Sequence, residues 1–285
     1  MTGTVLDDQQ LAAQAWFQDL RDRLCAAFET LEDEGSGLAP AGRFERIAWD
    51  RPDPSGNPGG GGVMSVMKGR VFEKVGVNTS TVFGTFAPEF AKSINGAGDD
   101  PRFFATGISL VAHMANPHVP AVHMNTRFLV TTKRWFGGGA DLNPALPVAA
   151  DTADFKVAFK AACDAHDPDY WDRFSRWCDE YFFVPHRGRN RGVGGIFYDH
   201  IEGDFAANFA FTQDVGRTLL TTFPAIVRRR MHASFSEADR LAQLRYRGLY
   251  AEFNLVYDRG TTFGLKTGGN VDAILMSLPP LACWD

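Results

Sequence analysis

Apolar residues near the start of the chain recur every three or four positions, which is the spacing of one face of an α-helix. The residues in this pattern are Phe17, Leu20, Leu24, Phe28 and Leu31. Gly35 follows at the place where a helix is commonly capped at its carboxyl end. The pattern predicts an amphipathic helix as the first element.

The next part of the chain changes from helical spacing to turn-forming residues and then to strand-forming residues. Residues 51–62 hold three prolines and four consecutive glycines, which predicts a loop. Residues 63–77 and 79–86 are rich in Val, Phe and Thr, as strands are, with turn signals at Gly69 and at residues 76–78. Antiparallel pairing of these strands is the natural expectation.

Two further strands are predicted at residues 109–113 and 121–131, joined by a turn that contains two prolines. Near the end, residues 250–257 again have the composition of a strand, and residues 258–260 have that of a hairpin turn. The strands are therefore expected in the middle and at the end of the chain.

Helical patterns fill the region between these strands. Residues 151–181 show three- and four-residue spacing with a break near Pro168, and residues 204–230 continue as a helix. Ser236 and Asp239 resemble a capping box at the start of another helix. Because strands and helices are grouped rather than alternating, the sequence predicts an α+β fold with an antiparallel sheet.

Composition and charge narrow the classes of function. The chain of 285 residues is 45% hydrophobic and 22% charged, as an ordinary globular protein is, and its formal net charge of −5 argues against nucleic acid as a partner. We expect no membrane span and no signal peptide, and hence a cytoplasmic protein. The four cysteines are scattered without a C-x-x-C pair, which argues against a disulfide framework and an iron–sulfur cluster.

Three histidines lie close together in the sequence, at His113, His118 and His123. A metal site is one interpretation, although the spacing matches no tight ligand motif, and His118 is expected to be an ordinary turn residue. Alternation along a strand would place His123, Asn125 and Arg127 on one face. The arginine fork suits a carboxylate, so an acidic ligand is the simplest partner, and a solvated sheet face is the alternative.

Glycine-rich motifs follow this polar row. Residues 135–141 place Asp141 after three glycines, which permit close approach of a ligand to the backbone, although a plain turn with a surface Asp is also possible. Residues 186–192 form a basic run that suits an acidic group or is a solvated loop. Residues 266–270 add another glycine turn with exposed backbone donors.

These motifs together resemble the aerobic coproporphyrinogen III oxidases over nearly the whole chain. The matching segments are residues 71–74, 76–78, 135–141, 177–179, 191–199, 252–265 and 274–280. The resemblance implies a single domain over residues 1–285 with a large antiparallel sheet flanked by helices on both faces. It also implies conversion of two propionate groups of coproporphyrinogen III to vinyl groups, with molecular oxygen as co-substrate and no organic cofactor, by a homodimer.

The resemblance also implies roles for individual residues. Arg127 would hold a propionate, Asp141 would face the pyrrole N–H groups, and His123 would be a proton donor. Residues implied to line the substrate site are Ser109, Asn125, Thr126, Arg127, Gly268, Gly269 and Asn270. A divalent metal would have His113, His123 and His186 as ligands, but Lys156 stands where a further histidine is expected.

The chain departs from the family pattern at three other positions as well. Arg189 replaces a Glu, and Leu249 and Asn270 each replace an Arg. Losing two arginines would weaken binding of a tetra-acid, since a charged hydrogen bond is worth about 1.5–3 kcal/mol. The alternatives to an active oxidase are therefore a diverged tetrapyrrole-binding protein and, less well supported, a metal-dependent hydrolase.

Overall fold

One seven-stranded antiparallel sheet organises the molecule in the computed structural model, which describes residues 6–37, 39–53, 56–266 and 269–284. The strand order is β1-β2-β3-β4-β5-β6-β9, so nearly every strand pairs with its neighbour in the sequence. Short connections between sequential antiparallel strands explain this meander. The α+β fold expected from the sequence is confirmed.

The strands of the main sheet differ in length, and its central strands are the longest. They are β1 (Glu45–Pro52), β2 (Pro58–Met67), β3 (Phe72–Thr85), β4 (Arg102–Met114), β5 (Ala121–Val130), β6 (Arg134–Asn143) and β9 (Gly195–Ile201). A second sheet pairs β7 (Phe183–Val184) with β8 (Arg189–Asn190), on either side of the short 3-10 helix η1 (Pro185–Arg187).

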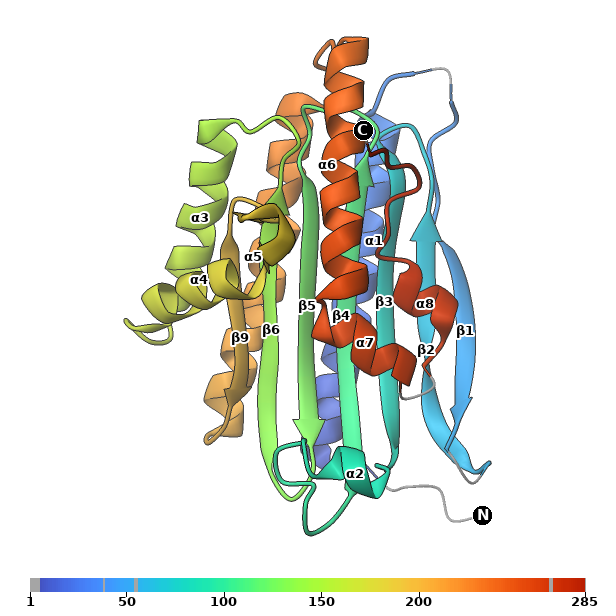
Figure 1. Ribbon diagram of the computed structural model, residues 1–285, viewed down its shortest axis with the longest axis vertical. Helices are drawn as coiled ribbons and strands as arrows, with labels where there is room; N and C mark the ends of the chain where they lie inside the picture. The colour runs from blue at the N-terminus through green and yellow to red at the C-terminus, as the bar shows by residue number, and fades with distance from the viewer. Residues whose placement is uncertain (1–5, 38, 54–55, 267–268, 285) are drawn as a thin grey trace.

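Helices cover both faces of the main sheet (Figure 1). They are α1 (Asp8–Glu34), α2 (Pro88–Ala91), α3 (Ala149–Asp164), α4 (Tyr170–Tyr181), α5 (Phe205–Arg230), α6 (Glu237–Val256), α7 (Arg259–Lys266) and α8 (Val271–Leu275). Helix α1 packs on β3 and β4, and α5 packs on β5 and β6. Helices α6, α7 and α8 lie in front of the opposite face in Figure 1. Within the described residues, no helix combines the length and the apolar character that crossing a membrane requires.

The predicted first helix is confirmed as α1. It begins at a capping box formed by Asp7 and Gln10 and ends at Gly35, whose backbone N–H donates to the carbonyl of Leu31. Its apolar side packs on the sheet, where the ring of Phe28 stacks on that of Phe72 with centroids 4.9 Å apart. Burial of this apolar stripe, rather than helix propensity alone, holds the helix in place.

Strand β5 shows how the two faces of the sheet differ. Its residues alternate strictly between half-buried and buried along the strand. Buried residues such as Met124 and Phe128 contribute to the core beneath α1 and α5, on what we call the core face. His123, Asn125 and Arg127 lie on the opposite side, which we call the site face. The period-two alternation of the sequence thus separates a packing surface from a polar one.

The loop predicted at residues 51–62 is wrong, because most of this segment belongs to strands β1 and β2. Gly61 and Gly62 pair with β1 so closely that a Cβ on Gly61 would lie 2.2 Å from the carbonyl oxygen of Trp49. A Cβ on Gly62 would lie 2.6 Å from the indole ring of the same Trp49. Here glycine permits close packing within a strand rather than a turn.

Three other expectations also failed. Residues 76–78 lie inside β3 rather than in a turn. Glycine is required at position 76 because Met276 occupies the space that a side chain there would fill. Residues 250–257 belong mostly to α6, which begins at the predicted capping box of Ser236 and Asp239. Of residues 258–260, the first lies between α6 and α7 and the other two begin α7, so no hairpin forms there. Tertiary packing of the helix outweighs the strand-like composition.

Candidate functional site

A chain of hydrogen bonds runs along the site face of β5. The Nη1 group of Arg127 donates to Oδ1 of Asn125 at 3.0 Å, and Nδ2 of Asn125 lies 3.1 Å from Nε2 of His123. The Nδ1 atom of His123 lies 2.7 Å from Oδ1 of Asp141. A carboxylate only accepts, so Nδ1 donates and Nε2 accepts from Asn125, which fixes the histidine tautomer.

Asp141, directly opposite His123 on β6, is buried, with 1% of its side chain exposed. Arg191 donates from Nη2 to both of its carboxylate oxygens, at 2.8 and 2.7 Å. The amide of Asn143 donates to Oδ2 at 2.8 Å. Each carboxylate oxygen therefore accepts two hydrogen bonds: Oδ1 from His123 and Arg191, and Oδ2 from Arg191 and Asn143.

The electrostatics of Asp141 follow from this arrangement. Burial alone would raise the pKa of the carboxyl group, but the neighbouring Arg191 guanidinium and the hydrogen bond with His123 outweigh it and lower the pKa to about 2. Burial likewise opposes the charge on Arg191, and Asp141 outweighs it and raises the pKa of that guanidinium. Both groups are therefore held ionised inside the protein.

Aromatic rings enclose Arg191. Its guanidinium carbon lies 4.1 Å from the ring centroid of Phe182, 4.5 Å from that of Tyr250 and 4.9 Å from that of Phe253. Its Nη1 group donates to Asn254 at 3.0 Å. Cation–π contacts and a buried partner fix the arginine in one position, so that it supports Asp141 without being open to solvent.

Arg127 lies on the open part of the site face. Its Nη2 group forms an ion pair with Asp199 of β9 at 2.8 Å, and 31% of the arginine side chain is exposed. Ser109 stands opposite Asn125 in the register of β4 and β5, and Gly107 stands opposite Arg127. Small residues and a guanidinium thus share a surface that an acidic ligand can reach.

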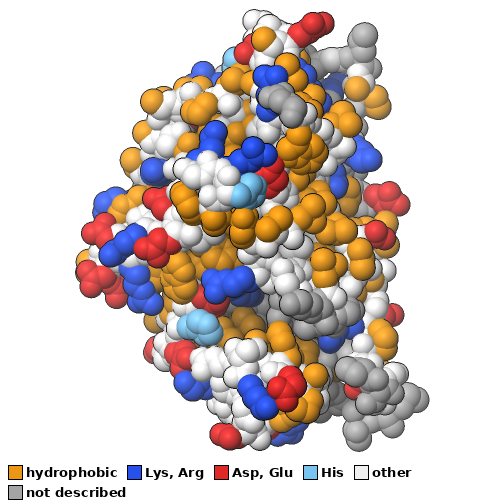
Figure 2. Space-filling view, viewed as in Figure 1, with side chains coloured by type: hydrophobic (Ala, Val, Ile, Leu, Met, Phe, Trp, Pro, Cys, Tyr) orange, Lys and Arg blue, Asp and Glu red, His pale blue; other side chains and the backbone are white. Residues whose placement is uncertain are grey.

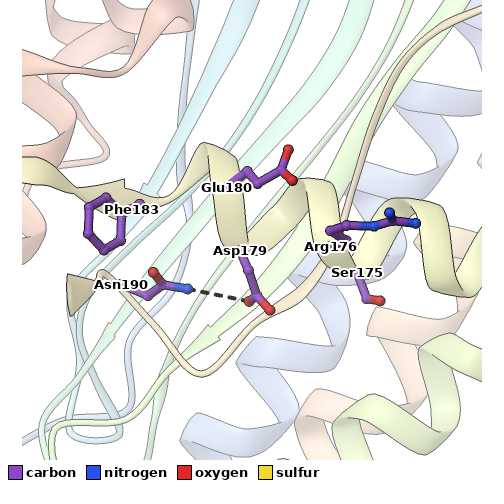
Figure 3. A pocket seen from close by; sticks show the side chains of 6 residues that line it. All are labelled: Ser175, Arg176, Asp179, Glu180, Phe183 and Asn190. Carbon is purple, nitrogen blue, oxygen red and sulfur yellow. Dashed lines mark hydrogen bonds between the residues drawn. The ribbon is translucent and has the colours of Figure 1, made fainter. Parts of the chain in front are cut away.

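A separate pocket of about 640 Å³ lies beside α4, and it is lined by Ser175, Arg176, Asp179, Glu180, Phe183 and Asn190 (Figure 3). The amide of Asn190 reaches Asp179 at 3.5 Å. Between this pocket and Asp141 is a gap, lined in part by Cys178 and Phe182, that is too narrow for a water molecule. On this side, Asp141 is closed off from solvent.

Comparison with known proteins decides the family. The family model described as coproporphyrinogen III oxidase matches residues 12–285. A protein of Rickettsia bellii (strain RML369-C) named oxygen-dependent coproporphyrinogen-III oxidase is 55% identical over 274 residues, covering 95% of this chain and 96% of the relative. A protein of Rickettsia felis with the same name is 56% identical over 279 residues, covering 96% and 98%. The chain belongs to the coproporphyrinogen III oxidase family.

The site residues expected for a coproporphyrinogen III oxidase are brought together only in part. His123, Asn125, Arg127 and Ser109 share the site face. Thr126 lies between them in sequence, but it is fully buried on the core face. Asp141 is close to His123, yet it is buried rather than presented to a ligand.

The glycine turn implied to line the substrate site is described only at its end. Gly268 lies outside the described residues. The backbone N–H of Gly269 donates to the carbonyl of Gly264 at 2.9 Å, and Oδ1 of Asn270 accepts from the N–H of Ala273, also at 2.9 Å. Asn270 is thus the N-cap of α8, so its side chain has a structural partner where the family pattern has an arginine.

The three histidines of the implied metal set have different environments. Nε2 of His113 donates to the carbonyl of Ser277 at 2.9 Å, and burial lowers the pKa of this histidine to about 3. Both ring nitrogens of His186 lie 2.7 Å from partners, Tyr257 and Glu252. Across the described ranges, no three His, Cys, Asp or Glu side chains gather as a metal-binding group. The residues do not fit a common metal site.

Sequence reasoning missed three residues that shape the site. Arg191 belongs to a basic run and, with Asp199, to a segment that matches the family, but the sequence assigns neither residue a role at the site. Nothing in the local pattern points to Asn143 as a partner of a site residue. Arg191 is 50 positions from Asp141, so only the fold brings the two together. The one available signal was the charge of Arg191 in a segment that matches the family.

Proposed function

We propose that this protein catalyses the oxygen-dependent oxidative decarboxylation of coproporphyrinogen III to protoporphyrinogen IX, a step of haem biosynthesis. Two propionate side chains become vinyl groups, each losing carbon dioxide and two electrons, with molecular oxygen as the acceptor. The observation that carries the proposal is the hydrogen-bonded row from His123 to Arg127 on the open site face, in a chain of this family.

Arg127 is proposed to bind a propionate of the substrate. Its planar fork of N–H donors matches a carboxylate, and Asn125 and Asp199 hold it from two sides. Such support limits the rotamer freedom that the arginine loses when a ligand binds. The substrate is thereby placed against the small residues of β4 and β6.

His123 is proposed to exchange a proton with the substrate through Nε2. Its Nδ1–H is bound to Asp141, so Nε2 is the ring nitrogen left for chemistry once the ligand takes the place of the Asn125 amide. Asp141 acts through His123 by fixing its orientation and stabilising a positive charge on the ring. General acid–base help of this kind is typically worth about 10²–10⁴ in rate.

We further propose that the reaction needs no organic cofactor, because the electron-rich pyrrole can itself give electrons to oxygen. A divalent metal held by His113, His123 and His186 is not part of this proposal, because these residues have separate partners. The cytoplasmic location expected from the sequence stays a prediction.

A homodimer also stays a proposal, and the surface of the helical layer supports it. Figure 2 shows apolar side chains spread over this side of the molecule between separate basic and acidic groups. Leu255, Val256 and Val271 are each more than half exposed there, on α6 and α8. Exposed apolar patches of this kind commonly mark association surfaces. Light scattering that compares the molecular mass of the purified protein with that of the Val256→Glu variant would test the homodimer. A monomeric wild type would contradict the proposal.

The function is tested by incubating the protein with coproporphyrinogen III in air and without oxygen. We expect protoporphyrin fluorescence, after oxidation of the product, only in air. Arg127→Gln should raise KM, while Arg134→Gln, which breaks an exposed pair with Asp7, serves as the matched control. Tight substrate binding without oxygen uptake would instead favour the diverged tetrapyrrole-binding protein.

A further inference from the structure

Beyond Arg127, the site face changes from polar to apolar. Leu129 lies two residues after Arg127 on β5, and Ala105 stands opposite Leu129 on β4. Val82 stands opposite Ala105 on β3. All three side chains are half-buried, so each keeps part of its surface in contact with solvent. We call Val82, Ala105 and Leu129 the apolar shelf, and it borders the row from His123 to Arg127.

The helices on this side of the sheet leave the apolar shelf uncovered. The Asn78 amide on β3 donates to the carbonyl of Ala273 in α8 at 2.9 Å, and Val82 lies farther along the same strand, away from α8. Figure 1 shows α7 in front of β4 and β5 and α2 at the ends of these strands, with no helix drawn in front of the stretch between them. Partly exposed apolar groups that gather on one face favour an apolar ligand or partner.

Arg51 reaches over the site face at the end of the apolar shelf that is farther from Arg127. It belongs to the edge strand β1, yet its guanidinium carbon lies 5.7 Å from the ring centroid of Phe103 on β4. Its Nη1 group donates to the carbonyl of Phe83 at 3.4 Å. Phe103 precedes Ala105 by two residues, so its ring lies on the same face of the sheet. The guanidinium is thus placed beside the shelf.

Close packing fixes the surroundings of Arg51. The ring of Phe103 stacks on that of Phe86, with centroids 4.1 Å apart. Gly60, opposite Val82 on β2, has a φ of 90°, and a Cβ there would lie 2.1 Å from a carbonyl oxygen of β3. Glycine is therefore required at this position. As a result, no side chain from β2 stands between β1 and Val82 in this row.

Arg51 and Arg127 lie at opposite ends of the apolar shelf. Gly107 stands opposite Arg127, and Phe103, which the Arg51 guanidinium covers, precedes Gly107 on β4. At about 3.3 Å per residue, these two positions on β4 are about 13 Å apart. A ligand that reaches both arginines must carry two carboxylates on an apolar body of about that length.

We propose that Arg51 binds a second propionate of the substrate that Arg127 holds, while the methyl-bearing edge of the tetrapyrrole packs on the apolar shelf. This inference rests on the proposed function, which supplies a substrate with one methyl and one propionate on each pyrrole. The fork of N–H donors on Arg51 suits a carboxylate, and the methyl groups suit the shelf. A second cation here adds to the grip on a tetra-acid in a chain that has Asn270 where the family pattern has an arginine.

The test compares coproporphyrinogen III with its tetra-amide, in which every propionate is replaced by a neutral propionamide of nearly the same shape. Binding of each ligand to the wild type and to Arg51→Gln is measured without oxygen by quenching of tryptophan fluorescence, so that no turnover intervenes. We expect the variant to lose about 10- to 100-fold of its affinity for the tetra-acid, as for a lost charge-assisted hydrogen bond. The affinity for the tetra-amide should change little, because this ligand forms no ion pair with Arg51.

The ratio of the two affinities is the decisive readout. If Arg51 only stabilises β1, Arg51→Gln will weaken both ligands equally or neither, and the proposal is overturned. Arg46→Gln is the matched control and should change neither affinity, because Arg46 lies on the same strand but pairs with Asp22 of α1 at 3.0 Å. If Arg51→Gln does not fold, Arg51→Lys keeps the charge without the fork and should lose part of the affinity for the tetra-acid only. An unchanged ratio in that variant likewise overturns the proposal.

The contact with the apolar shelf is tested by Leu129→Ala in the same assay. This variant should lower the affinity for the tetra-acid and for the tetra-amide by the same factor, since both ligands carry the same methyl groups. Unchanged affinities would contradict packing of the substrate on the shelf.

Failure of the proposed function is seen separately, by turnover of the wild type in air. A wild type that binds the tetra-acid but forms no protoporphyrinogen would contradict the oxidase, and the affinity ratio in Arg51→Gln would still decide the role of Arg51. A wild type that binds neither ligand would contradict both.

Discussion

The buried ion pair of Asp141 and Arg191 should dominate the local stability of the site. Exposed fractions of 1% and 2% place both charges away from water, with 2.7 Å between Oδ2 and Nη2. Lowering the carboxyl pKa from 3.8 to about 2 corresponds to about 2–3 kcal/mol of preference for the ionised form. Because the folded pKa is depressed, this stability is present above pH 4 and is lost as the pH falls towards 2.

Removing either partner leaves the other buried and unpaired, which typically costs about 3–5 kcal/mol. We therefore expect Asp141→Asn and Arg191→Met each to lower the free energy of unfolding by this amount. The double variant should lose much less than the sum, because no buried charge is left alone. Residual hydrogen bonds from Asn143 and contacts of the aromatic rings with residue 191 favour the lower end of the range.

Urea unfolding of the two single variants and the double variant, followed by circular dichroism, gives the coupling free energy. The matched control is the same cycle at Asp33 and Arg43, whose atoms are 2.6 Å apart but whose side chains are more than half exposed. There the coupling should be far smaller than at the buried pair, because solvent screens exposed charges. Single variants at the buried pair that cost under about 1 kcal/mol, or costs that simply add, would refute this account of the site.

Three further predictions concern residues around the site. Burial keeps His113 neutral until about pH 3, whereas in the unfolded chain this histidine takes up a proton below pH 6.5. As the pH falls from 6.5, the free energy of unfolding of the wild type should therefore decrease by about 1.4 kcal/mol per pH unit relative to His113→Phe. Urea titrations that give a pH-independent difference between the two proteins would contradict this. Gly137→Ala should raise KM with little change in stability, because the new Cβ meets only the ends of the Asp199 and Arg127 side chains. Gly139→Ala should lower the free energy of unfolding by about 1–3 kcal/mol, because its Cβ would lie 2.3 Å from the backbone oxygen of Ile196. Steady-state assays and thermal melts on both variants separate the two effects, and a reversed pattern would be inconsistent with the geometry. His123→Gln should lower kcat by about 10²–10⁴ with substrate binding retained; wild-type kcat in oxygen-uptake assays would exclude the proton-transfer role.

Predictions that depended on local periodicity succeeded. The helical spacing that ends at Leu31 gave α1, and the alternation from His123 to Arg127 placed three polar side chains on one face. In both cases the spacing of a few neighbouring residues determines which side is buried. Predictions of turns from glycines were wrong, because Gly61 and Gly76 permit close packing between elements rather than turns. The strand predicted from composition at residues 250–257 was also wrong.

The parts of the site that were not predicted depend on contacts between distant segments. Asp199 reaches Arg127 only because β9 joins the sheet beside β6 with a shifted register, and a local pattern does not encode that register. The sequence predicted that Asp141 faces a ligand, because the three glycines before it permit close approach, with a surface turn as the alternative. The structure buries it through Arg191, which arrives from a segment beyond α4.

The substitutions that set this chain apart from its family pattern have local structural roles in two cases. Leu249 is 8% exposed and packs with Phe182, Phe197 and Phe253, so an apolar side chain suits that position. Asn270 caps α8. The row of His123, Asn125 and Arg127 is held by its own hydrogen bonds and by its contacts with Asp141 and Asp199. Since an unpaired buried charge would be costly while a lost surface contact is not, these changes should alter the affinity for the outer carboxylates of the substrate more than the chemical step.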